Sequence, residues 1–232
     1  MNNFSIVIPA FNEGDNLAIL IDEIINSIDN SKYEFEIIIV DDCSNDDTVS
    51  KISECIKKYN LVYIKNNENF GQSKSIHKGI SHSKFSNIIT IDADLQNDPK
   101  DIKALCEVYF SDQNYGMVSG IRIKRKDSIV KIISSKIANK IRSFILNDKC
   151  PDTGCSLKIF NKHIFLEFEL FDGLHRFLPA LFLNKNALVQ YVPVNHRPRI
   201  NGKSKYGTIS RLVWGIRDLI RVKKMLVKTK DD

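Results

Sequence analysis

Residues 88–96 of this 232-residue chain read IITIDADLQ. Residues 88–91 form a β-branched, apolar run of the kind found in buried strands. Two aspartates, Asp92 and Asp94, follow at alternate positions directly after that run. A buried strand that ends in paired carboxylates indicates a sheet whose strand ends carry ligand-binding side chains.

The rest of the chain repeats this alternation of apolar strands and helical segments. Apolar residues recur at helical spacing over 16–28, whereas 36–40 is a run rich in β-branched residues that leads into Asp41 and Asp42. Asp98 followed by Pro99 is a helix start, because aspartate caps and proline suits the first helical position. Strands are expected at 4–8, 36–40, 61–65, 88–91, 117–121, 157–160 and 189–194, and helices at 16–28, 47–59, 72–81, 99–110, 128–146, 175–183 and 209–227.

This order predicts an α/β fold with a mostly parallel central sheet covered by helices on both faces. Ligands of such sheets bind just beyond the carboxyl ends of the strands. Three polar clusters fall at those ends, namely residues 9–13 (PAFNE), the pair 41–42 (DD) and the acidic tetrad 92–95 (DADL). We expect the three clusters to converge in one cleft.

The acidic tetrad is a candidate metal site. Two carboxylates beside a buried strand are costly unless a positive charge lies near them. Mg²⁺ or Mn²⁺ bound to a diphosphate would supply that charge, and both ions prefer oxygen ligands. Asp92 and Asp94 would be ligands, and the Gln96 amide offers one more oxygen. The alternative is a solvated turn that begins the next helix, since Asp and Asn are common in turns.

The pair Asp41 and Asp42 also has two interpretations. A carboxylate at a strand end can accept hydrogen bonds from a nucleotide base or from ribose hydroxyls, which makes both residues candidates for nucleotide binding. Ser44, Asn45 and Asp46 follow directly and equally suit an ordinary turn.

A basic loop at residues 197–206 (RPRINGKSKY) places four cations around Gly202. Arginine can hold phosphate oxygens through a fork of two hydrogen bonds, and lysine adds a point charge. The loop is therefore a candidate for closing over phosphates, and the alternative is a solvated basic loop.

The net charge of +6 is unevenly placed, because residues 199–232 contain ten Lys or Arg and three Asp. This asymmetry favours a phosphorylated ligand or an anionic membrane surface as partner. We expect one catalytic domain over 1–208 and then a basic amphipathic helix over 209–232, which would either bind a membrane or pack on its own domain. No nucleic-acid motif with base-stacking aromatics occurs, so nucleic acid is not expected as a partner.

Neither a spanning helix nor a signal peptide is recognised in the sequence. We therefore expect a cytoplasmic protein, peripheral on the inner face of the membrane.

Four motifs in this order and at this spacing resemble family 2 inverting glycosyltransferases: residues 7–13 (VIPAFNE), 40–44 (VDDCS), 69–71 (NFG) and 92–96 (DADLQ). Two later stretches, 152–158 (DTGCSLK) and 199–205 (RINGKSK), resemble the dolichol-phosphate mannose synthase branch, whose members load a sugar onto a polyprenyl phosphate. The resemblance covers nearly the whole chain. It implies a GT-A-type domain that binds a nucleotide-sugar.

The resemblance also implies a role for each matching residue. Arg122 matches an arginine that faces the acceptor phosphate, and Lys131 and Ser135 match a helical acceptor site. That site usually has arginine where this chain has Lys131, which weakens the case for forked phosphate recognition there. The remaining matches are Pro9, Ala10, Asn12, Glu13 and Asp42 in the nucleoside pocket, Asp92, Asp94 and Gln96 at the metal and diphosphate, and Arg199 and Lys205 as phosphate clamps.

Residues 170–179 (LFDGLHRFLP) resemble a bacterial subgroup that makes undecaprenyl-phosphate sugars for lipid A or other envelope glycans. The implied reaction is in-line attack of the lipid phosphate on the anomeric carbon of a nucleotide-sugar, with a UDP-sugar favoured. A divalent metal would neutralise the departing diphosphate, and an already ionised phosphate needs no strong general base.

Three alternatives stay open at this point. One is a GDP-mannose-dependent polyprenyl-phosphate mannose synthase. Another is a transferase to a glycan hydroxyl, which would need a carboxylate base. The third is a non-enzymatic module that binds anionic lipid through its basic C-terminal region.

Overall fold

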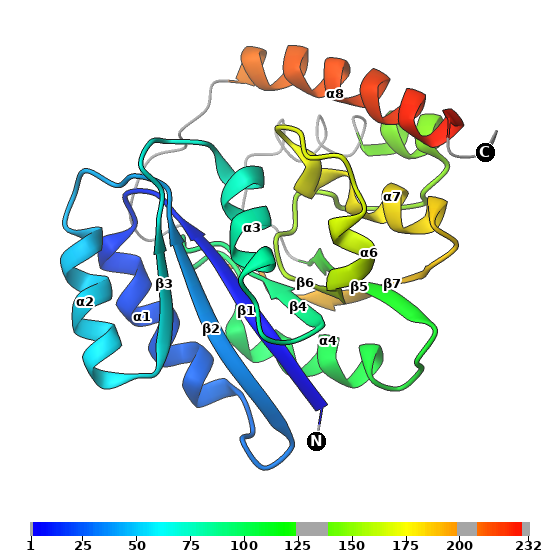
Figure 1. The fold of residues 1–232 in the computed structure, drawn as a ribbon. Helices are drawn as coiled ribbons and strands as arrows, with labels where there is room; N and C mark the ends of the chain where they lie inside the picture. Colours follow the sequence, from blue (N-terminus) through cyan, green and yellow to red (C-terminus); the bar gives the residue numbers. More distant parts are fainter. Residues whose placement is uncertain (1, 124–138, 199–207, 229–232) are drawn as a thin grey trace.

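The structure is a computed structural model that describes residues 2–123, 139–198 and 208–228, without the side chains of 208–214 and 228. Seven strands form one sheet in the order β3-β2-β1-β4-β6-β5-β7 (Figure 1). The strands are β1 (Asn2–Ala10), β2 (Tyr33–Asp41), β3 (Leu61–Lys65), β4 (Asn87–Thr90), β5 (Tyr115–Arg122), β6 (Lys158–Asn161) and β7 (Leu188–Val194). All pairings are parallel except those of β6, so the predicted mostly parallel α/β fold is confirmed.

Helices cover both faces of the sheet because its central strands are apolar on both sides. Ile6 and Ile8 of β1 point into one core cluster, whereas Val7 points into the other, as the two-residue period of a strand requires. The first face carries α1 (Gly14–Ser27), α2 (Thr48–Lys58), η1 (Pro99–Asp101) and α4 (Ile102–Tyr109), and the second carries α3 (Gln72–Ser81), α6 (Lys162–Leu166), η2 (Leu174–Arg176), α7 (Leu178–Asn184) and α8 (Thr208–Lys228).

The antiparallel strand β6 places a sequence motif at the same edge of the sheet as the strand ends. β5 ends at this edge, and β6 begins there and runs back between β4 and β5. The backbone N–H of Gly120 in β5 donates to the carbonyl of Leu157 at 2.9 Å. Residues 152–158 therefore lie beside the carboxyl ends of β4 and β5.

Two predicted helices differ from those in the structure. The helix expected over 175–183 is divided into η2 and α7, because α7 restarts with Pro179 in its first turn, where proline needs no N–H partner. Of the helix expected over 128–146, residues 139–146 are helical and the rest lies outside the described residues.

The C-terminal helix α8 lies across the end of the molecule at which the parallel strands finish (Figure 1). Val222 and Leu226 on its inner side are buried in the second core cluster. No helix in the described part of the chain is long and apolar enough to cross a membrane.

Candidate active site

The three polar clusters meet in one cleft at the carboxyl edge of the sheet, as the sequence predicts. The loops after β1, β2 and β4 each contribute to it, and the fourth side is the start of α3 with the loop before it. The lining residues are Pro9, Ala10, Phe11, Glu13, Asp42, Asn69, Gly71, Gln72, Ser75, Asp92, Ala93 and Asp94.

Each of the three strand-end loops contains a residue other than glycine with a positive φ. These residues are Asn12 (φ 53°), Cys43 (φ 65°) and Leu95 (φ 61°). This conformation is unfavourable for a bulky residue such as Leu95, and strain of this kind concentrates at functional sites. At Leu95 it lets the backbone N–H of Gln96 turn back to Asp94 Oδ1, at 3.1 Å.

Asp41 and Asp42 organise the loops around the cleft. Buried Asp41 accepts hydrogen bonds from the Ser44 backbone at 2.9 Å and from the Tyr63 hydroxyl at 3.1 Å. Asp42 accepts from the backbone N–H groups of Phe70 (2.9 Å) and Gly71 (2.8 Å). Asp41 does not line the cleft, so its assignment to nucleotide binding stays a prediction. Asp42 reaches the cleft and also fixes one of its walls.

Asp92 is held in place by two neighbours to which the sequence analysis assigned no role. The Gln72 amide donates to Asp92 Oδ1 at 2.7 Å, and the Asp92 backbone N–H donates to Ser156 Oγ at 3.2 Å. Burial and the adjacent Asp94 raise the pKa of Asp92 to about 6, although the hydrogen bond with Ser156 and the charges of Lys158 and Arg122 lower it. Two carboxylates that repel each other in this way favour a cation between them.

The acidic tetrad fits a divalent metal that is held jointly by the protein and by the phosphates of a substrate. No group of three or more His, Cys, Asp or Glu side chains able to hold a metal is found among the described residues. Asp92 and Asp94 are two carboxylates on one cleft wall, and Mg²⁺ commonly binds one or two carboxylates together with substrate phosphates. The Gln96 side chain is not among those lining the cleft, so its assignment as a metal ligand stays a prediction.

Replacing Gln72 by alanine should raise the Mn²⁺ concentration needed for half-maximal activity by roughly tenfold, as loss of an outer partner of a metal ligand typically does. Gln72 orients the Asp92 carboxylate, and alanine removes the donor without adding charge. Activity titrated with Mn²⁺ measures the effect. The exposed Gln113→Ala is the matched control, and an equal shift in both variants would contradict the assigned role.

Arg122 lies at the end of β5 in a forked ion pair with Asp152. Its Nε and Nη2 donate to the two Asp152 carboxylate oxygens at 2.7 and 2.8 Å, and both side chains are largely buried. A Cβ added at Gly154 would lie 2.5 Å from Arg122 Nη2, so only glycine lets the guanidinium lie there. Residues 152–154 thus hold Arg122 at the carboxyl edge of the sheet.

A partly buried layer of polar side chains supports the cleft from behind. His175 Nδ1 lies 2.8 Å from Ser73 Oγ, which also accepts from the backbone N–H of Gly173 at 3.0 Å. Buried Lys158 donates to the carbonyl of Cys155. Burial, together with the charges of Arg176 and Lys158, lowers the pKa of His175 to about 3, so the imidazole is neutral near pH 7.

The free energy of unfolding should therefore fall as pH drops below about 6.5. In the unfolded chain His175 binds a proton near pH 6.5, whereas in the folded protein it stays neutral down to about 3. Between those values the unfolded state binds more protons, which costs at most about 1.4 kcal/mol per pH unit. Urea unfolding of the wild type and of His175→Gln at pH 7.5, 6 and 5 measures this, and equal slopes for the two proteins would contradict it.

Arg197, the first cation of the basic loop, is not placed for phosphate binding. Its guanidinium forms ion pairs with Glu23 and with Asp98, each at 2.7 Å, which tie residue 197 to α1 and to the turn before η1. Arg197 is therefore engaged in ion pairs, and the phosphate-binding role of this loop stays a prediction that depends on Arg199 and Lys205. The predicted site residues Lys131, Ser135, Arg199 and Lys205 lie outside the described residues.

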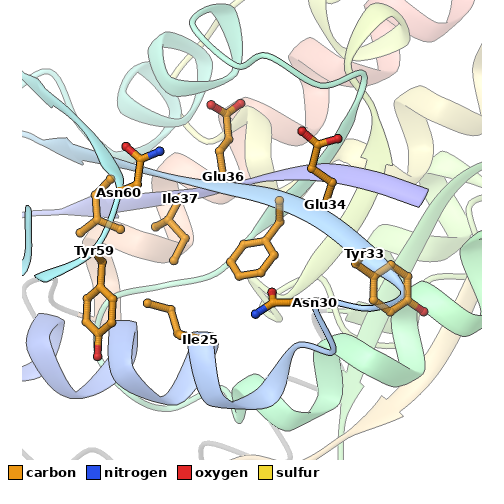
Figure 2. A pocket seen from close by; sticks show the side chains of 10 residues that line it. Ile25, Asn30, Tyr33, Glu34, Glu36, Ile37, Tyr59 and Asn60 are labelled. Carbon is orange, nitrogen blue, oxygen red and sulfur yellow. The ribbon is translucent and has the colours of Figure 1, made fainter. Parts of the chain in front are cut away.

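A second cavity of about 390 Å³ lies at the opposite edge of the sheet, where β2 and β3 begin (Figure 2). Ile25, Tyr33 and Tyr59 contribute to its walls, and Glu34 and Glu36 lie along β2 beside it. Glu34 pairs with Lys84 at 2.9 Å, and Glu36 accepts from Ser5 Oγ at 2.5 Å. This cavity contains none of the predicted site residues, so the smaller cleft at the acidic tetrad is the better candidate for the active site.

Comparison with known proteins places these features in a family. Residues 5–168 match the model described as Glycosyl transferase family 2. An undecaprenyl-phosphate 4-deoxy-4-formamido-L-arabinose transferase from Edwardsiella ictaluri is 32% identical over 93% of this chain and 66% of that protein. A dodecaprenyl-phosphate galacturonate synthase from Rhizobium johnstonii is 33% identical over 94% of this chain and 65% of that protein. The chain thus spans slightly less than two thirds of the length of either relative.

Solved structures share the fold of this chain. Glucosyl-3-phosphoglycerate synthase from Mycobacterium tuberculosis, in complex with Mn²⁺, UDP-glucose and phosphoglyceric acid, superposes with a TM-score of 0.74. It is 14% identical, and the match covers 97% of this chain and 79% of that one. At this identity the likeness establishes the fold alone.

Proposed function

This chain belongs to glycosyl transferase family 2, and we propose that it transfers a sugar from a nucleotide-sugar, with a UDP-sugar favoured, to the phosphate of a polyprenyl phosphate such as undecaprenyl phosphate. The observation that carries the proposal is the forked Arg122–Asp152 pair at the catalytic edge, close enough for its charge to act on Asp92. The names of the two relatives above point to the same acceptor class. The product would be a lipid-linked sugar for lipid A or another envelope glycan.

The donor half of the reaction uses the cleft. The strand-end loop with Pro9, Ala10 and Glu13 would hold the nucleoside against the wall that Asp42 fixes. Asp92 and Asp94 would hold Mg²⁺ or Mn²⁺, which when bound neutralises charge on the diphosphate leaving group. Gln72 and Ser156 keep the Asp92 carboxylate and its backbone oriented while that charge develops.

The acceptor half needs positioning more than proton transfer. A lipid phosphate is already ionised near neutral pH, so Arg122 can orient it for in-line attack without a general base. A hydroxyl acceptor would instead need a carboxylate base. Asp152, the carboxylate beside Arg122, accepts two of that guanidinium's N–H groups, which disfavours it as a base.

The test incubates purified protein and Mn²⁺ with radiolabelled UDP-sugars or GDP-mannose and one of two acceptors, undecaprenyl phosphate or undecaprenol. We expect label to enter the lipid phase only with the phosphate, and the product mass then identifies the sugar. Equal transfer to undecaprenol, or release of free sugar alone with every donor, would show that the acceptor assignment is wrong.

An acceptor of this kind lies in a membrane, so the enzyme would work as a peripheral protein on the cytoplasmic face of that membrane. The basic character of residues 209–232 supports this location.

A further inference from the structure

In its part with described side chains, residues 215–227, helix α8 has two apolar sides, and only one of them is buried against the domain. Val222 and Leu226 are buried against the domain. On the opposite side Ile216, Ile220 and Val227 are 52%, 54% and 50% exposed. At 100° per residue these three positions fall within about 40° of one another, so they form a single stripe along the helix.

Cations border this stripe. Arg217 and Lys224 lie on one side of it and Lys223 lies on the other, and all three are exposed. Asp218, the single acidic residue between 215 and 227, is turned inward and pairs with Arg176 at 2.7 Å. The outer face of α8 is therefore apolar at its centre and positive at its borders.

A second exposed apolar patch lies beside the C-terminal half of α8. In the helical residues 139–146, Ile141 is 55% exposed and Phe144 is 89% exposed. Lys223 Nζ donates to the carbonyl of Ile145 at 3.1 Å, and Leu146 is buried in the same cluster as Val222 and Leu226. We call the residues Ile141, Phe144, Ile216, Ile220 and Val227 the outer apolar surface.

This surface lies at the catalytic end of the molecule. α8 crosses the end at which the parallel strands finish (Figure 1). Its Asp218 pairs with Arg176, next to His175, and His175 contacts Ser73 at the start of α3. Gln72, the neighbour of Ser73, contacts Asp92. A partner bound to the outer apolar surface would thus lie close to the cleft.

We propose that the outer apolar surface docks on an anionic lipid bilayer and presents the active site to the bilayer surface. An apolar stripe bordered by Lys and Arg fits the boundary between acyl chains and negatively charged headgroups. A second copy of the chain fits less well, because the bordering cations would then face like charges. This docking rests on the proposed function, because that function requires the enzyme to meet a bilayer.

The test measures co-sedimentation of the full chain with vesicles of phosphatidylcholine alone or with 30% phosphatidylglycerol. We expect binding to the anionic vesicles that weakens with salt. The double variant Ile216→Ser/Ile220→Ser and, separately, Phe144→Ser should each bind at least tenfold more weakly. Ile56→Ser is the matched control, since Ile56 is an exposed isoleucine on α2, and it should bind as the wild type does.

Turnover separates this proposal from the proposed function. The Ile216→Ser/Ile220→Ser enzyme should keep its activity on a short, water-soluble polyprenyl phosphate and lose it on undecaprenyl phosphate in vesicles. Unchanged melting temperatures verify folding. The docking proposal is overturned if the variants bind vesicles as the wild type does, if Ile56→Ser loses binding equally, or if sedimentation equilibrium shows that the variants only dissociate a dimer. Absence of turnover on either acceptor by a wild type that binds vesicles would count against the proposed function alone.

Discussion

Replacing Asp94 by asparagine should lower the rate of sugar transfer by roughly 10²- to 10³-fold, the loss typical when one preorganised electrostatic group is removed. Asp94 lines the cleft beside Asp92, and the backbone N–H of Gln96 fixes one of its oxygens. Asparagine keeps the shape and can still accept that hydrogen bond. It removes the negative charge that would bind the metal, so diphosphate departure would no longer be assisted.

The measurement is the initial rate at saturating nucleotide-sugar over a range of Mn²⁺ concentrations. Part of the loss should return at high Mn²⁺ if the defect is metal affinity. Asp112→Asn is the control, because Asp112 is an exposed carboxylate that accepts from a backbone N–H in a turn far from the cleft. A variant that loses less than threefold in rate would exclude Asp94 from the metal site.

The positions of most strands and helices could be predicted because their apolar patterns are long and unambiguous. Residues 37–40 and 88–91 are buried runs inside the sheet, and 16–28 shows helical spacing throughout. The convergence of the three polar clusters followed from one rule, that parallel strands end at the same edge. Local pattern did not reveal that β6 runs antiparallel between β4 and β5, because the direction of a strand depends on where the preceding chain returns to the sheet.

The partners of the site residues were harder to predict than the residues themselves. Gln72 and Ser156 are 84 positions apart in the sequence, yet both contact Asp92. Gln72 directly follows the 69–71 motif, which is the one signal that could have drawn attention to it. Asp152 lies inside a recognised motif, but its partner Arg122 is thirty positions away, and spacing alone does not pair them. Such contacts depend on the tertiary fold.

The different contributions of Asp41 and Asp42 illustrate the same limit. The sequence offered either nucleotide binding or an ordinary turn for the pair. In the structure both carboxylates bind backbone N–H groups of the loops, as turn residues do, and Asp42 also reaches the cleft. The two interpretations are therefore compatible for Asp42, because a carboxylate that fixes a loop can also form part of the wall that meets the ligand.

Arg122→Lys should lower kcat/KM for undecaprenyl phosphate by roughly 10- to 100-fold, because charge-assisted hydrogen bonds contribute about 1.5–3 kcal/mol each. Lysine keeps the charge but lacks the planar fork of N–H groups through which Arg122 binds Asp152. The cation would therefore no longer be held in a fixed orientation. The loss should appear mainly in the KM for the acceptor. The affinity for UDP, measured by calorimetry with Mn²⁺, should change by less than threefold, since Arg122 does not line the donor cleft.

Gly154→Ala provides an independent route to the same defect, because the added Cβ would lie 2.5 Å from Arg122 Nη2 and push the guanidinium aside while leaving its charge intact. If orientation of Arg122 is what matters, Gly154→Ala and Arg122→Lys should raise the acceptor KM similarly, and the double variant should be little worse than either single one. If Arg122 serves only as the partner of Asp152, both variants should instead lower the melting temperature and leave the acceptor KM unchanged. The change in the acceptor KM, compared with the changes in UDP affinity and in melting temperature, therefore decides whether this ion pair positions the lipid phosphate or only stabilises the fold.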